Sequence, residues 1–199
     1  MTPYEIIAAP FTVWFAPVGE AFPAIDAVPA GNWAKIGTSG DLNESEDGVT
    51  VAHSQTTETA RVAGTTGPRK AFRTAEDLMI RFTMLDMSLE HYKHAMNGNA
   101  VTTTAAGSGT AGFKKIGLRQ GLAVSTMALL VRGDASAYGD GYKGQYEIPI
   151  CFQSGSPEPV FRKGQPAGLA LEFTALEDAG AASEAERFGR LIFQHQAAL

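Results

Sequence analysis

Apolar and polar residues alternate along much of the chain, and this pattern predicts β-strands. In the run from Asp77 to Met84, the even-numbered residues are all large and apolar, so they would share one face of a sheet. Pro149 cannot donate to a ladder, so its strand should lie at a sheet edge or carry a bulge. Strands of this kind are predicted at residues 11–16, 33–37, 77–84, 113–118, 125–132, 146–153 and 168–175.

One segment has helical spacing instead. Ser88 is a suitable N-cap, and Leu85, Leu89, Tyr92 and Met96 recur at helical spacing on one stripe. The Asn-Gly pair that ends at Gly98 tolerates the left-handed conformation that stops a helix. We expect the stripe to pack on the sheet. The side chains expected to contact solvent are Glu90, His91, Lys93 and His94.

The segment from about residue 38 to residue 73 has few large apolar residues, and Val49, Val51 and Val62 are the main ones. It therefore cannot add much to a core. Its first part is acidic and its last part is basic. We expect it to project from the body as a long hairpin or loop, and ordered loops of this length are usually functional.

These elements predict a mainly β fold in a single domain, residues 1–199, built as a β-sandwich or barrel with one flanking α-helix and the projecting hairpin or loop. A net charge of −5 argues against a protein that grips nucleic acid by its phosphates. The single cysteine excludes an intramolecular disulfide. The apolar run from Gly121 to Val131 is too short to span a bilayer, and no export signal is recognisable, so we expect folding in the cytoplasm.

Motifs that suggest chemistry have weak support. G-x-G-x-x-G occurs at residues 107–112 and 139–144, but strand patterns follow each match, so both are expected to be loops. His91 and His94 could share a metal, yet no third ligand lies near them in sequence. Cys151 is expected to be a small buried thiol. We therefore predict a protein that is not an enzyme and needs no cofactor or metal.

Several segments resemble the tail tube (major tail) proteins of long-tailed bacteriophages. The resemblance is strongest to the non-contractile, siphophage-like type that gene transfer agents also use. It begins with Gly-Thr-Ser-Gly-Asp-Leu-Asn-Glu-Ser-Glu-Asp-Gly-Val-Thr-Val at residues 37–51 and covers most of the chain. The other matching segments are residues 68–73, 76–81, the helix from Leu89, 156–161, 168–178 and 186–191.

The resemblance implies a structural virion protein. Its hexameric rings would join their inner sheets into one barrel and stack into a hollow tube. The tube would be assembled in the host cytoplasm around a tape measure protein and bounded by tail terminator and distal tail or baseplate proteins. DNA would pass through the lumen without specific binding, and the chain would not span a membrane.

Two groups of residues are candidates for these roles. Acidic and basic parts of the projecting segment could meet across stacked rings, and residues opposite the core face of a strand could line the lumen. The stacking candidates are Asp41, Glu44, Glu46, Asp47, Arg61, Arg69 and Lys70. The lumen-facing candidates are Glu172, Thr174, Glu147 and Gln145.

Two other functions compete with a virion tube. One is the tube subunit of a contractile injection or type VI-like secretion system. The other is a carbohydrate-binding β-sandwich module, which usually needs exposed aromatic side chains, whereas both tryptophans, Trp14 and Trp33, lie in predicted strands.

Overall fold

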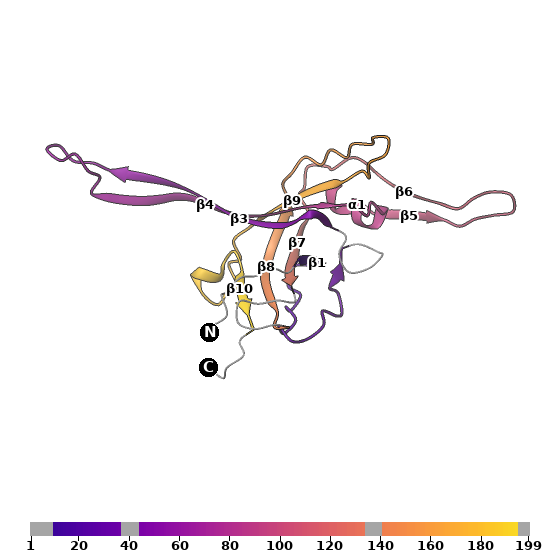
Figure 1. The fold of residues 1–199 in the computed structure, drawn as a ribbon, viewed down its shortest axis with the longest axis horizontal. Helices are drawn as coiled ribbons and strands as arrows, with labels where there is room; N and C mark the ends of the chain where they lie inside the picture. The colour runs from indigo at the N-terminus through magenta and orange to yellow at the C-terminus, as the bar shows by residue number, and fades with distance from the viewer. Residues whose placement is uncertain (1–9, 37–43, 134–140, 195–199) are drawn as a thin grey trace.

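A computed structural model describes residues 10–36, 44–133 and 141–194, and for residues 44–46 it describes the backbone alone. Antiparallel strands make up most of this structure, with one short α-helix (Figure 1). The elements are β1 (Phe11–Ala16), β2 (Ala34–Lys35), β3 (Glu44–Ala60), β4 (Lys70–Met84), α1 (Leu89–Ala95), β5 (Val101–Thr104), β6 (Phe113–Ile116), β7 (Thr126–Gly133), β8 (Gly144–Gln153), β9 (Leu169–Ala175), the 3₁₀ helix η1 (Glu184–Glu186) and β10 (Arg190–Phe193).

Eight of the strands form one antiparallel sheet. Its order is β2-β1-β7-β8-β9-β4-β3, with β10 paired to β8 off this path. Although β1 and β3 lie near opposite ends of this order, they contact each other, so the sheet curls around its core face. The prediction of a mainly β, sandwich-like fold with one flanking helix is confirmed.

The core is built from the period-2 pattern of the strands. Ile80 and Phe82 of β4 lie beside Phe173 and Leu171 of β9, and all four side chains are buried. The Phe173 ring stacks on Phe82 at 6.1 Å between centroids and contacts Phe15 of β1 at 5.4 Å. One face of each strand therefore closes a continuous apolar interior.

A second, smaller core lies on the opposite face of β1 and β7. There, Trp33 and Leu130 are buried, and Phe22 packs against them from the segment before β2. The Trp33 indole donates to the Ala21 carbonyl at 2.9 Å. The segment between β1 and β2 thus covers the back of this part of the sheet.

Strand β8 carries the bulge that Pro149 predicted. Met127 pairs with Cys151 and Leu129 pairs with Ile148, so two residues of β8 lie opposite one residue of β7. The same point separates the part of β8 that pairs with β10 from the part that pairs with β9. A central strand therefore tolerates a proline because the ladder is already interrupted there.

Helix α1 differs from its predicted form. The Ser88 side chain makes no capping hydrogen bond, and Leu85, expected on the apolar stripe, is exposed. Tyr92 and Met96 pack against the core as expected. The predicted solvent exposure of both histidines is wrong, because His91 is buried and His94 stacks on the Phe15 ring at 4.1 Å.

Two hairpins leave the body in opposite directions (Figure 1). The longer one is formed by β3 and β4, and every residue from 53 to 77 is exposed; we call this part the long arm. The shorter one, residues 101–116, pairs β5 with β6 and is called the short arm. A projecting hairpin was predicted here, but within the described part of the predicted segment Val49 and Val51 pack against the core instead of projecting. No strand was predicted at residues 101–104, so β5 was missed.

No helix in the described parts of the chain has the length and apolar character needed to cross a membrane.

Candidate assembly surfaces

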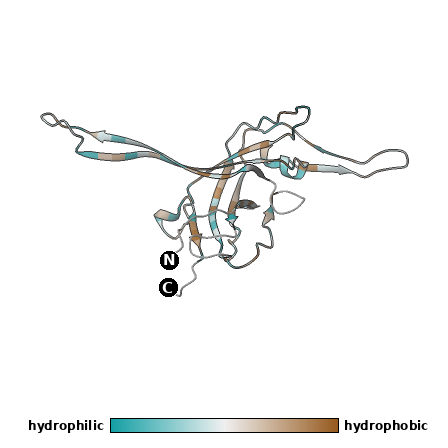
Figure 2. Cartoon of the chain, in the orientation of Figure 1, coloured by the Kyte–Doolittle hydropathy of each residue, from teal (hydrophilic) through white to brown (hydrophobic). Residues whose placement is uncertain are grey.

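The long arm is a polar two-stranded ribbon. Figure 2 shows hydrophilic positions recurring along it, while hydrophobic positions gather in the strands of the body. Arg73 holds the two strands together, donating to Gln55 of β3 at 2.9 Å and to Glu76 of β4 at 2.7 Å. A solitary two-stranded hairpin is marginally stable in water. An arm of this length is therefore suited to lie against another protein surface.

Charge is distributed along the long arm rather than across it. The tip carries Arg61, Arg69 and Lys70, whereas Glu76 and Asp77 lie at the root. The Arg61 guanidinium donates to the Thr66 carbonyl across the turn at 2.9 Å. The sequence suggested an acidic outgoing part and a basic return part that could meet across stacked rings, but the outgoing strand of the long arm carries a single acid, Glu58. One end of the arm is basic and the other is acidic.

The stacking candidates consequently lie far apart. Asp47 is exposed where β3 joins the body, and about 14 residues of extended strand, roughly 45 Å, separate it from Arg61. Asp41 lies outside the described residues, as do the side chains of Glu44 and Glu46. The structure brings Arg61, Arg69 and Lys70 together at the tip. Lys70 also lies over the Phe72 ring, 5.0 Å from its centroid, and Phe72 is a large apolar side chain exposed on the arm.

The outer face of β3, β4 and β9 is open and polar. Glu172 and Thr174 lie on it as predicted, because Leu171 and Phe173 face the core. Arg81 forms an ion pair with Glu172 across the β4–β9 pair, and Thr174 donates to the Ser154 hydroxyl at 2.7 Å. Arg81, Glu172 and Asp47 line a groove of about 350 Å³ on this face.

The other two lumen candidates, Glu147 and Gln145, are not on an open face. Gln145 is 0% exposed and Glu147 is 2% exposed, so the prediction that they face a channel is wrong. They point toward the back of the sheet, where the segment between β1 and β2 covers them. The alternation of residues along β8 correctly placed both side chains on the face opposite its bulky apolar residues. The segment that covers this face, however, comes from a remote part of the sequence.

A chain of hydrogen bonds links these buried groups. Arg132 donates to the Gln145 side-chain oxygen at 2.8 Å and to the Ala27 carbonyl at 2.5 Å. The Gln145 amide in turn donates to Glu147 and to the Pro23 carbonyl. Glu147 accepts from Arg190 of β10 at 2.6 Å, and this pairing raises the pKa of the Arg190 guanidinium. The network holds the covering segment and β10 on the sheet.

Neither histidine of α1 occupies a metal-binding arrangement. His94 lies flat against Phe15, and in the described residues no cluster of three His, Cys, Asp or Glu side chains could hold a metal ion. Cys151 is buried as predicted, and burial raises the pKa of its thiol to about 12. A thiol of that kind is unreactive near neutral pH.

Burial of His94 predicts an acid-sensitive fold. Desolvation lowers its pKa from 6.5 to about 3, with smaller contributions from Lys93 and His91. Between these two values, the unfolded chain binds a proton that the folded chain does not. The stability contributed by neutral His94 is thus complete above pH 6.5 and falls as the pH drops toward 3, by up to about 1.4 kcal/mol per pH unit.

The variant His94→Phe keeps an aromatic ring against Phe15 and removes the titration. We expect its free energy of unfolding, measured by urea denaturation from pH 7 to pH 4, to vary less steeply with pH than that of the native chain. His53→Phe, on the exposed long arm, is the matched control and should leave the slope unchanged. Parallel slopes for His94→Phe and the native chain would contradict this assignment.

Neither the models of known protein families nor the curated proteins gave a match to this sequence.

Proposed function

We propose that this protein is a structural virion subunit whose hexameric rings stack into a hollow, non-contractile tail tube. The observation that carries the proposal is the long arm, an ordered, exposed polar ribbon that extends well beyond the body (Figure 1). Such an exposed ribbon contributes little to the stability of its own subunit. In a stack of rings, it can reach a neighbouring subunit and place its basic tip on an acidic surface.

Stacking of this type is head-to-tail. The basic tip of the arm and the acidic surface that receives it are different parts of the subunit, so each subunit offers one of each. Contacts of this heterologous kind generate rings where the rotation closes and open-ended assemblies where it does not. Each exposed ion pair is weak, but the same contact recurs in every subunit of every ring.

The outer face of β3, β4 and β9 is the proposed wall of the lumen. Asp47 and Glu172 lie on it with Arg81 as their counter-charge, which leaves a net negative face. A wall of this sign lets the DNA polyanion slide, whereas repeated cations would hold its phosphates. DNA then passes through the tube without binding specifically to its wall.

Reversal of one charge on this face tests whether it lines the lumen through which DNA passes. Glu172→Lys would remove an acid and leave Arg81 unpaired, so each ring would present new cations to DNA. We expect virions assembled with this variant to deliver DNA at least about tenfold more slowly, as measured by the time course of ejection. The exchange Glu172→Lys with Arg81→Glu keeps the net charge and serves as the control. Normal ejection by intact Glu172→Lys particles would remove this face from the lumen.

A further inference from the structure

An irregular loop, residues 117–125, is held in place by side chains at the end of α1. Asn97 donates to the carbonyls of Gln120 and Ala123 at 2.7 and 2.6 Å and accepts from the Ser125 amide at 2.5 Å. Asn99 donates to the carbonyls of Gly117 and Arg119 at 2.7 and 2.9 Å. We call this segment the clamped loop. Its backbone is fixed although it belongs to no strand or helix.

The clamped loop presents apolar side chains to solvent. Leu118 is 71% exposed, Leu122 is 100% exposed and Val124 is 61% exposed. Ordering a loop costs conformational entropy, and leaving large aliphatic groups in water forgoes their burial. Both costs are understandable if the loop is shaped in advance to insert into another surface, since preorganisation reduces the entropy lost on binding.

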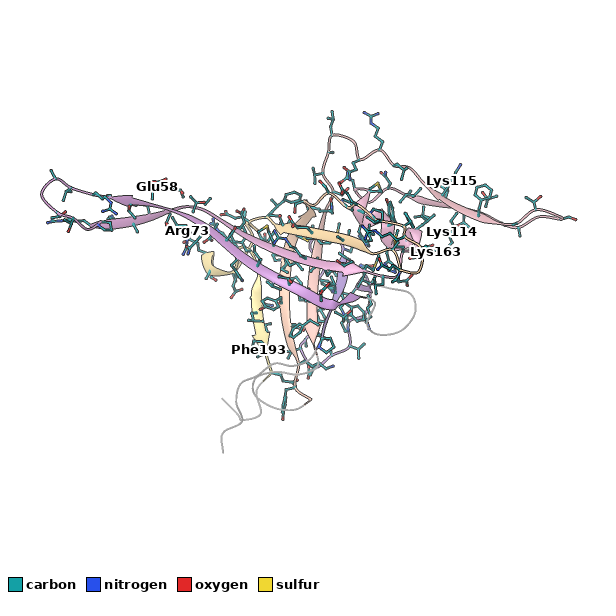
Figure 3. The ribbon with its side chains drawn as sticks, turned by 45° about the horizontal axis from the view of Figure 1, so that its top comes forward. Glu58, Arg73, Lys114, Lys115, Lys163 and Phe193 are labelled. Atoms are coloured by element: carbon teal, nitrogen blue, oxygen red, sulfur yellow. The ribbon has the colours of Figure 1, made fainter. Side chains whose placement is uncertain are left out.

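The charge around the loop defines its partner. Residues 101–125 contain Lys114, Lys115 and Arg119 and no acidic residue. Lys114 forms an ion pair with Glu90 of α1. Figure 3 shows Lys114, Lys115 and Lys163 at one end of the molecule and the long arm, marked by Glu58 and Arg73, at the other. A complementary surface must therefore combine an apolar depression with an acidic rim.

This chain has such a surface at the root of the long arm. A groove of about 390 Å³ lies between β3–β4 and the segment after η1, and Leu78 and Phe188 contribute apolar lining. Its charged lining is Glu76, Asp77 and Arg73; Arg73 forms an ion pair with Glu76, so the carboxylates outnumber the cation and the lining is net negative. Ala185, which faces the same groove, is flanked in sequence by Glu184 and Glu186. We call it the root groove.

We propose that the clamped loop of one copy inserts into the root groove of a neighbouring copy, with Leu122 as the apolar anchor and Lys115 and Arg119 facing the acidic rim. The two surfaces lie toward opposite ends of the subunit, so the contact is head-to-tail and passes from copy to copy. This inference rests on the proposed self-assembly and identifies one contact that holds neighbours together.

A designed disulfide tests the contact. Subunits carrying Leu122→Cys are mixed with subunits carrying Ala185→Cys, assembled, oxidised and run on a denaturing gel without reductant. We expect covalent dimers in the mixture, and an extended ladder from the double variant. The native Cys151 is buried and should not contribute. Val28→Cys, at a 76% exposed position in the segment between β1 and β2, replaces Leu122→Cys in the control and should give no dimer with Ala185→Cys.

Charge reversal gives an independent readout. The pair Lys115→Glu and Arg119→Glu should raise the subunit concentration needed for half-maximal assembly about tenfold, the equivalent of 1.4 kcal/mol. Adding Asp77→Lys and Glu184→Lys should restore it. Normal tubes without the Leu122–Ala185 crosslink would overturn this contact and leave the proposed function intact. A native chain that never assembles would overturn both.

Discussion

Replacement of residues 56–75 by Asn-Gly is expected to abolish tube formation and leave the body folded. The exchange joins Gln55 to Glu76, which already pair in the native register, through a two-residue turn that favours hairpins. It retains Val49 and Val51, which pack against the core. The deleted ribbon is exposed throughout, so the free energy of unfolding should change by less than about 1 kcal/mol.

Sedimentation velocity measures the assembly of the shortened chain, and chemical denaturation measures its free energy of unfolding. Rings could still form from the shortened chain, at six times the monomer mass, but they should not stack. A second variant keeps the arm at full length and neutralises its tip with Arg61→Gln, Arg69→Gln and Lys70→Gln. It should stack weakly and with less dependence on salt, because the ion pairs screened by salt are gone. Native-length tubes from the shortened chain would exclude the arm as the stacking element.

Gln145→Ala is expected to lower the free energy of unfolding by about 3–5 kcal/mol. The Gln145 side chain is fully buried and connects Arg132 with Glu147, whose own side chains are 5% and 2% exposed. Its removal takes hydrogen-bond partners away from two buried charged groups at once. Loss of its bond to the Pro23 carbonyl would also loosen the segment that covers this face.

The same substitution at an exposed glutamine is the natural control. Gln165→Ala, in the segment before β9, should change the unfolding free energy by no more than about 0.5 kcal/mol in urea titrations. The comparison also distinguishes a Gln145 side chain buried in the network from one on an open channel wall. A residue on an open channel wall would tolerate truncation, so a near-zero effect would support the original lumen assignment and contradict the buried network.

Strands that bury one face were predictable from sequence. In β4 and β9, alternation in the sequence reports the two sides of the sheet, and a slip of one residue would expose every core side chain. Strand β5 lacks that signal, since most of Val101–Thr104 is exposed on both faces. The long arm was predicted from its lack of apolar residues, but its charge distribution depends on which residues pair across the hairpin.

Contacts between remote segments account for the errors at the candidate site. The pattern in β8 correctly set Glu147 opposite Ile148, yet nothing local indicates that residues near Pro23 cover that side. His94 was assigned to solvent from helix periodicity, while its actual neighbour, Phe15, lies on the first strand. Asn97 could be predicted to stop a helix, but not to bind the carbonyls of Gln120 and Ala123, more than 20 residues away.

Self-assembly into a hollow tube can be seen by electron microscopy of the purified, untagged chain in negative stain. We expect tubes of uniform width with a stain-filled lumen and a regular axial repeat, and sixfold symmetry in end-on views. The arm-shortened chain should give isolated rings or single subunits under the same conditions. Monodisperse single subunits of the native chain at every concentration and ionic strength tested would contradict the claim.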